Sequence, residues 1–170
     1  MNMKLIGALL IMLGCGGVGF SMTKNHKKEE NAMLELCRSL EWMILELNYR
    51  MPPLSSVCRG AADVCKGCIS RVFERLANEL DRQITPDAYA CMVAALASVP
   101  GVPERVTMHM KDLGTSFGKF DLQGQISGLE TTLALCKGEL QIMKNGREVR
   151  LRTYQTLGLC AGAALVILLL

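Results

Sequence analysis

The sequence predicts an all-α protein, a helical bundle of about six helices between two transmembrane helices. Half of the 170 residues are hydrophobic, and long uncharged runs occupy both ends of the chain. Between them, apolar residues recur at helical spacing, with no useful strand alternation. The length suits one domain with anchors. A net charge of +3 is too small and too dispersed to indicate a nucleic-acid partner.

Both ends of the chain are predicted to span a membrane. Residues 5–22 and 154–170 carry no charged side chain. At about 1.5 Å per residue, the first run is roughly 27 Å long, close to a bilayer core. We therefore expect transmembrane helices at residues 1–23 and 154–170, in contact with the lipid bilayer. A cleaved secretory signal is the alternative for the first run, although only Lys4 precedes it.

Residues 24–153 form the domain between the two spans. They hold every acidic residue and every lysine and arginine except Lys4. Basic residues lie beside both spans on the side of this domain: Lys24, Lys27, Lys28, Arg147, Arg150 and Arg152. The positive-inside rule therefore predicts a membrane protein with a cytoplasmic all-α domain and both termini outside.

Three helices are predicted in the first half of this domain. Pro52 and Pro53 end a helix at 27–50, because proline has no amide hydrogen to donate. The apolar stripe of that helix comprises Met33, Cys37, Leu40, Ile44 and Leu47. A short helix at 54–65 follows, and Gly67 breaks it. The third helix carries Ile69, Val72, Phe73, Leu76 and Leu80.

Three more helices are predicted in the second half. Thr85 as N-cap, with Pro86 at the first helical position, starts a helix that ends at Val99. Pro103 opens the fifth helix, and Gly118 closes it. Asp121 is placed to cap the sixth. The sixth helix has the clearest seam: Leu122, Ile126, Leu129, Leu133, Cys136, Leu140 and Met143.

The first and sixth helices of the domain each lead into a predicted span. We therefore expect their apolar stripes to pack together as a stalk beneath a small helical bundle. Glycines at Gly124, Gly128 and Gly138 suggest close contact with another helix, since each is costly within a helix. In the spans, small residues would let helices pack closely on each other or on another membrane protein: Gly14, Gly17, Gly158 and Gly162.

Three cysteines outside the helical stripes raise the possibility of a metal or redox site. Cys65 and Cys68 form a C-x-x-C, and Cys58 lies seven residues before Cys65. Zinc needs four ligands, and the two histidines of the chain are not paired. We favour thiols that pack as small hydrophobes in a reducing cytoplasm. The alternative function is a metal- or redox-responsive membrane sensor built on these cysteines.

No other motif in the sequence indicates a catalytic or cofactor-binding site. Gly114 to Lys119 resembles a phosphate loop, but Phe120 stands where serine or threonine would bind magnesium. His109 is expected to be exposed. The acidic residues of the first domain helix are expected to form a solvated face: Glu29, Glu30, Glu35, Glu41 and Glu46. We therefore predict no enzyme, no catalytic residue and no cofactor.

A series of short motifs runs through the whole chain in a fixed order. They include Met3 to Ala8 at the first span and Tyr154 to Gly158 at the second. Between them are Glu46, Tyr49, Pro53, Leu54, Gly114, Gly118, Asp121 and Gln125. Together they resemble the stage III sporulation protein AB family of endospore-forming bacteria. The family often has threonine at Pro52 and leucine at Phe117, and the Cys58, Cys65 and Cys68 cluster lies outside its pattern.

The resemblance implies a role that the residues alone do not. The family's cytoplasmic domain is similar to one in the platform protein of type II secretion and type IV pili. The implied role is a non-enzymatic platform in a secretion-like channel complex between mother cell and forespore. The domain would lie in the mother cell, anchored in the outer forespore membrane. The implied partners are the cytoplasmic secretion-type ATPase, stage III sporulation protein AA, and other membrane proteins of the channel. A homo-oligomer is a further expectation, and the motif residues are expected to make structural or partner contacts.

Overall fold

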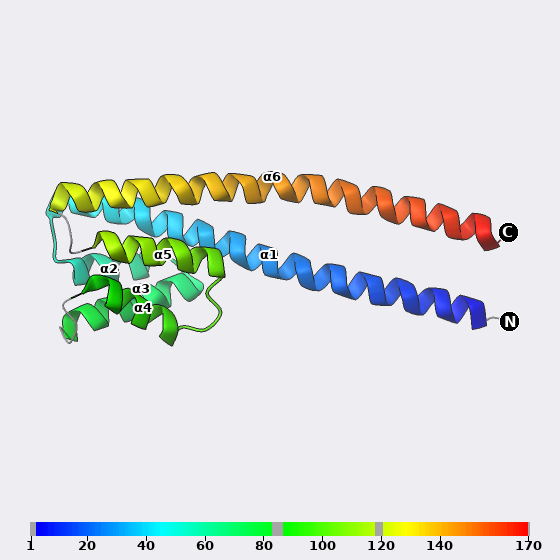
Figure 1. Cartoon of the computed structure of the whole chain (residues 1–170), viewed down its shortest axis with the longest axis horizontal. Helices are drawn as coiled ribbons and strands as arrows, with labels where there is room; N and C mark the ends of the chain where they lie inside the picture. The colour runs from blue at the N-terminus through cyan, green and yellow to red at the C-terminus, as the bar shows by residue number, and fades with distance from the viewer. Residues whose placement is uncertain (1–2, 83–86, 118–120, 170) are drawn as a thin grey trace.

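The computed structural model describes residues 3–82, 87–117 and 121–169, with side chains described for 26–82, 87–117 and 121–145. All regular structure in these residues is helical, which confirms the all-α prediction. Two helices of 48 residues each, α1 (Met3–Arg50) and α6 (Leu122–Leu169), run along the length of the molecule. Figure 1 shows both chain ends at the same end of the molecule.

Four shorter helices form a head domain on one side of α1, far from the chain ends (Figure 1). They are α2 (Leu54–Val64), α3 (Gly67–Arg82), α4 (Ala88–Ser98) and α5 (Glu104–Ser116). Gly67 and Gly101 turn the chain with φ of 72° and 83°, which a residue with a side chain rarely adopts. These turns hold successive helices close enough to pack against one another.

The long helix α1 ends where the proline pair predicts. Met51 follows the last helical residue with φ of 47°, and Pro52 and Pro53 come next. A left-handed residue after a helix is normally glycine or asparagine, so methionine there is unusual. The chain leaves α1 at the tip, which we define as the end of the molecule opposite the chain ends. There α1 ends, α2 begins, α5 ends and α6 begins (Figure 1).

Two aspartates cap the N-terminal ends of α4 and α6. The Asp121 carboxylate accepts the Gly124 N–H at 2.9 Å, which confirms its predicted cap on α6. The Asp87 carboxylate accepts the Tyr89 N–H at 3.1 Å, and α4 begins after it at Ala88. The predicted start at Thr85 and Pro86 is therefore too early, because aspartate supplies the acceptor that the first turn needs. Residues 83–86 lie outside the described residues.

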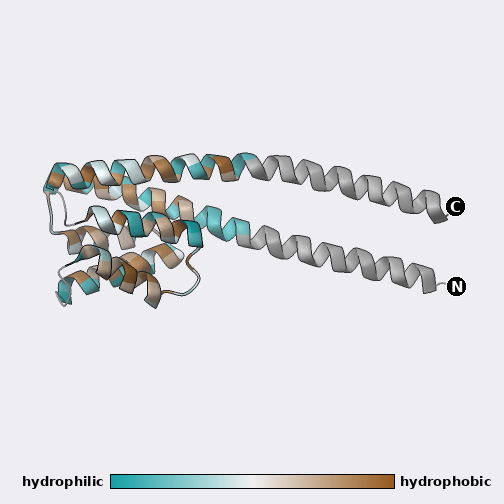
Figure 2. Ribbon diagram, viewed as in Figure 1, coloured by the Kyte–Doolittle hydropathy of each residue, from teal (hydrophilic) through white to brown (hydrophobic). Residues whose placement is uncertain are grey.

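One hydrophobic core joins all six helices of the described chain. It contains the predicted stripes of α1 and α6, and Figure 2 shows hydrophobic residues along both helices. The largest fully buried side chains are Phe73, Phe117, Met33, Leu36, Leu40, Met43, Ile69, Leu76, Met92, Met110, Leu113 and Leu129. Burying each such side chain contributes about 1.5–3 kcal/mol.

The predicted stalk beneath a bundle is corrected in one respect. Within the described side chains, α1 and α6 pack on each other and also on the head domain. Helix α1 contacts α2, α3 and α5, while α6 contacts α5. The apolar stripe of each long helix is wide enough to face two neighbours at once. These parts of α1 and α6 are therefore members of the bundle.

The predicted membrane spans fall on residues 1–23 and 154–170, whose side chains lie outside those described. In the part of the chain that the structure describes, no helix carries a stretch both long and apolar enough to cross a membrane. The predicted packing glycines Gly14, Gly17, Gly158 and Gly162 lie in the same undescribed regions. The first coloured part of α1 in Figure 2 is hydrophilic; it begins at residue 26, and its Lys27 and Lys28 are exposed.

Candidate functional site

The described family-motif residues between the two predicted spans come together at the tip. Glu46 and Tyr49 lie in the last turns of α1, and Pro53 precedes α2. Asp121 precedes α6 and Gln125 lies in its first turn, where its N–H donates to the Asp121 carbonyl at 3.0 Å. These segments are far apart in sequence but meet at one end of the molecule (Figure 1). The motif therefore marks one region of the surface.

Most motif residues have a structural contact there. The Pro53 carbonyl accepts the N–H groups of Ser56 and Val57 at 2.9 and 3.1 Å, which starts α2. The Glu46 carboxylate pairs with Arg50 at 3.5 Å. Leu54 packs half-buried against the core.

Gly114, a motif glycine, lies where α5 packs on α4. A Cβ at Gly114 would lie 2.9 Å from the Met92 Cβ, so the motif glycine lets α5 approach α4. Gly118 lies outside the described residues.

Tyr49 is the exception among the motif residues, because it is 84% exposed. Leu45, one turn earlier on α1, and Met51, just after the helix, are also large, apolar and exposed. We call Leu45, Tyr49 and Met51 the tip residues. An exposed aromatic ring with apolar neighbours is typical of a contact surface, and no core contact explains it.

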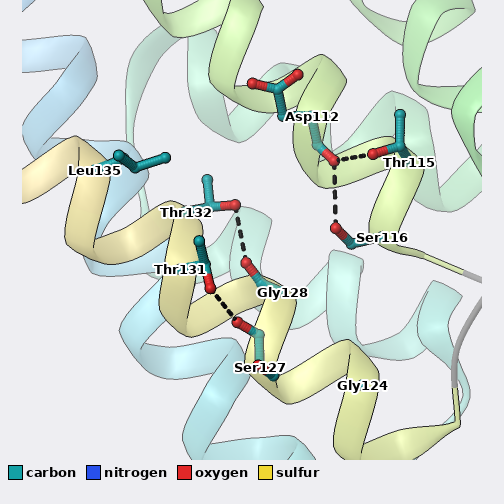
Figure 3. A pocket seen from close by; sticks show the side chains of 9 residues that line it. All are labelled: Asp112, Thr115, Ser116, Gly124, Ser127, Gly128, Thr131, Thr132 and Leu135. Atoms are coloured by element: carbon teal, nitrogen blue, oxygen red, sulfur yellow. Dashed lines mark hydrogen bonds between the residues drawn. The ribbon is translucent and has the colours of Figure 1, made fainter.

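A second feature is a groove between α5 and α6 with a volume of about 500 Å³. Figure 3 shows its lining, which is mostly hydroxyl side chains and glycines: Asp112, Thr115, Ser116, Gly124, Ser127, Gly128, Thr131, Thr132 and Leu135. Four of these hydroxyl groups donate to carbonyls of their own helices, those of Thr115, Ser116, Thr131 and Thr132. Thr131 donates to Ser127 at 2.8 Å and Thr132 to Gly128 at 2.9 Å. These hydroxyl groups are therefore already paired within their own helices.

Glycines of α6 behave differently along this groove. A Cβ at Gly128 would lie 2.8 Å from the Ser116 Cβ, so the predicted close contact is confirmed at that position. Gly124 lines the groove. Gly138 has no atom within 4 Å of its Cβ position, so the same prediction is wrong there within this chain.

His109 is buried, which corrects the prediction of an exposed histidine. It is 8% exposed, and its Nε2 lies 3.4 Å from the Glu139 Oε1 across the α5–α6 contact. The other polar atoms of the pair, His109 Nδ1 and Glu139 Oε2, are buried without a hydrogen-bond partner in the described chain. His109 follows Val106 by three residues and precedes Leu113 by four, so the helical spacing could have indicated burial.

The acidic residues of α1 are also more than a solvated face. Glu29 pairs with Arg105 of α5 at 3.4 Å, and Glu41 pairs with Lys137 of α6 at 2.6 Å. Glu35 accepts the Lys66 N–H at 2.9 Å, at the turn between α2 and α3. These three residues also tie α1 to its neighbours, while Glu41 is exposed as predicted. Sequence spacing missed this because their partners lie on other helices.

The cysteine cluster does not form a metal site in the described chain. No three His, Cys, Asp or Glu side chains there are arranged to hold a metal ion. Cys58 and Cys65 are buried free thiols, and Cys68 is half-buried. Burial raises the pKa of Cys58, while burial and the nearby Glu35 charge raise the pKa of Cys65 to about 12. Such thiols pack as hydrophobes and are poor nucleophiles at neutral pH.

Comparisons with known proteins identify the family. A comparison with curated proteins found no match. A solved structure titled "Stage III sporulation protein AB" is similar in fold, with a TM-score of 0.61 and 15% sequence identity. The match covers 72% of this chain and 98% of that chain. A family model described as "Stage III sporulation protein AB" matches residues 4–170. The chain therefore belongs to the stage III sporulation protein AB family.

Proposed function

We propose that this protein is a non-enzymatic membrane platform in a sporulation channel complex, and that it couples a cytoplasmic ATPase to the membrane assembly. One observation carries the proposal: α1 and α6 both lead from the tip to the same end of the molecule. The uncharged run at residues 5–22 belongs to the N-terminal part of α1, and the run that starts at residue 154 belongs to the C-terminal part of α6. A membrane there would leave the tip as the most distant point of the protein.

The long helices suit the transmission of force. A helix of 48 residues is about 72 Å long at 1.5 Å per residue. Contacts tie α1 to α6 beside the head domain, including the ion pair of Glu41 with Lys137 at 2.6 Å. The buried stripes of α1 and α6 belong to one core. A displacement applied at the tip would therefore move both helices together, because close-packed cores resist deformation.

The tip residues Leu45, Tyr49 and Met51 are the proposed contact for the ATPase. They are exposed, they lie beside the family-motif residues, and they are far from the chain ends. An exposed tyrosine with apolar neighbours is the type of residue that anchors protein interfaces. The family resemblance points to stage III sporulation protein AA as this ATPase. The corresponding location is the outer forespore membrane, with the head domain in the mother cell.

The test is capture of the ATPase by the full-length protein. Tagged protein in native membranes is expected to retain stage III sporulation protein AA. Tyr49→Ala is expected to weaken capture roughly tenfold or more, because tyrosine anchors commonly contribute 2 kcal/mol or more to binding. Binding would be measured by quantitative immunoblotting of the captured ATPase.

The control variant is Tyr89→Ala, which removes a less exposed tyrosine from α4. It is expected to capture the ATPase as the unsubstituted protein does. If the full-length protein in membranes captures no ATPase, the coupling role is wrong. If Tyr49→Ala and Tyr89→Ala bind equally, the ATPase contacts a different surface.

A further inference from the structure

Helix α6 carries a second stripe of residues that faces away from the core. Within it, Leu135 is 55% exposed and Ile142 is 69% exposed. The spacing alternates four and three residues throughout, which is the repeat of a helix-packing seam. We call these exposed residues the outer stripe: Thr131, Leu135, Gly138 and Ile142.

The outer stripe contains no charge, although it faces outward. The charged residues of this part of α6 lie off it, and two of them are used within the chain. Lys137 pairs with Glu41 of α1, and Glu139 pairs with His109 of α5. A surface helix normally turns its charged side chains outward. The arrangement here suits a neutral partner, because a charged surface would lose water without gaining an opposite charge.

The stripe also has room for a helix to approach. Gly138 comes between Leu135 and Ile142 along the stripe, and no atom of the described chain lies within 4 Å of its Cβ position. Glycine destabilises a helix interior, and no contact within the described chain requires it here. The groove of about 500 Å³ between α5 and α6 continues the surface beside Leu135, Thr131 and Gly128 (Figure 3).

We propose that the partner at the outer stripe is a second copy of this chain, with the two α6 helices parallel. The direction rests on the membrane anchoring in the proposed function. Both chain ends lie at one end of the molecule, so two copies anchored in one membrane have the same orientation. In a parallel pair, equivalent residues of the two outer stripes face each other, so both surfaces of the contact are uncharged. Leu135 meets the partner's Leu135, and Gly138 lets the backbones approach.

Membrane anchoring would also favour this contact energetically. Two exposed apolar residues and small neighbours give a modest interface for free molecules. Confinement in one membrane raises the effective concentration of the second copy, so a weak contact becomes populated. The pairing is therefore expected in membranes and is expected to weaken on dilution in detergent.

Site-specific photocrosslinking of the full-length protein in membranes tests the contact. A photoreactive amino acid at position 135 or 142 is expected to give a product of twice the chain mass, containing this chain only. The same probe at Glu130, which is exposed on α6 but off the stripe, is the control. Equal yields at 130 and 135, or products with another polypeptide only, would overturn the proposal.

A variant separates this proposal from the proposed function. Leu135→Glu combined with Ile142→Glu is expected to lower the crosslinked fraction roughly tenfold, with the probe at Thr131. Met108→Glu is the control, because Met108 is 62% exposed on α5 and belongs neither to the outer stripe nor to the tip residues. Both variants should keep the helical circular dichroism spectrum, since the changed side chains lie outside the core. Unchanged self-crosslinking in the double variant would contradict the proposal. ATPase capture, measured in parallel, reports on the platform role independently.

Discussion

At the scale of single residues, polar side chains that bridge helices were the hardest to predict. His109, Glu29, Glu35 and Glu41 all have partners on elements distant in sequence. Helical spacing identifies which apolar residues face a core, but it does not identify the residue opposite a polar one. Asp121 was predictable because its acceptor role depends only on the turn that follows it. Local chemistry was therefore readable from the sequence, and chemistry between helices was not.

The buried cysteines give a prediction at this scale. At pH 8, iodoacetamide is expected to modify Cys68 before Cys58 and Cys65 in the folded protein. Cys68 is half-buried, whereas the other two are buried thiols with raised pKa values. Alkylation needs the thiolate, so a raised pKa suppresses it. Peptide mass spectrometry over time measures the order. Modification of Cys58 as fast as Cys68 would revive the redox alternative.

The raised pKa of Cys65 predicts a loss of stability at alkaline pH. The pKa of Cys65 rises from its ordinary value of 9.0 to about 12 in the folded protein. The folded state therefore favours the protonated thiol. Its contribution to stability is full below pH 9.0 and declines as pH rises toward about 12. Thermal unfolding between pH 8 and 11 is expected to show a smaller decline in Cys65→Ala. Identical pH dependence in the variant would contradict this assignment.

At the scale of helices, periodicity predicted the elements well but predicted their packing incompletely. The stripes of α1 and α6 and the stop at Pro52 were all found from sequence, because each depends on local geometry. The start of α4 was placed too early because Thr85, Pro86 and Asp87 offer competing start signals. The contact of α1 and α6 with the head domain was missed, since one stripe does not reveal how many neighbours it has.

Two glycines on α6 give a matched prediction at this scale. Gly138→Ala is expected to stabilise the protein by about 0.5–1 kcal/mol, because its Cβ meets no atom within 4 Å and glycine is costly in a helix. Gly128→Ala is expected to destabilise it by about 1–3 kcal/mol, because its Cβ would lie 2.8 Å from the Ser116 Cβ. Thermal unfolding in detergent measures both. Destabilisation by Gly138→Ala would indicate a contact that the chain alone does not provide.

At the scale of the whole molecule, the important result is the gathering of distant motifs at the tip. Tyr49 and Asp121 are far apart in sequence, and the intervening head domain folds back so that both lie at one end (Figure 1). The sequence contained the motif residues but not their common location, because that depends on how the helices pack. The platform role proposed above joins this tip to the membrane through α1 and α6.

The platform role depends on the membrane topology of the chain. The natural cysteines Cys58, Cys65 and Cys91 are poor reporters because they are buried. Tyr49→Cys places a thiol at the most exposed of the tip residues. Asn2→Cys places one before the first uncharged run, residues 5–22, and serves as the control. A membrane-impermeant maleimide would be applied to intact and to permeabilised protoplasts of growing cells that produce the protein in the cell membrane, because the forespore membrane is enclosed by the mother cell.

The account predicts that the thiol at position 2 reacts in intact protoplasts. The thiol at position 49 should react after permeabilisation only. This pattern would place the tip in the cytoplasm, where an ATPase could reach it. Reaction at position 49 in intact protoplasts would contradict the account, because the tip would then lie on the wrong side of the membrane for a cytoplasmic ATPase.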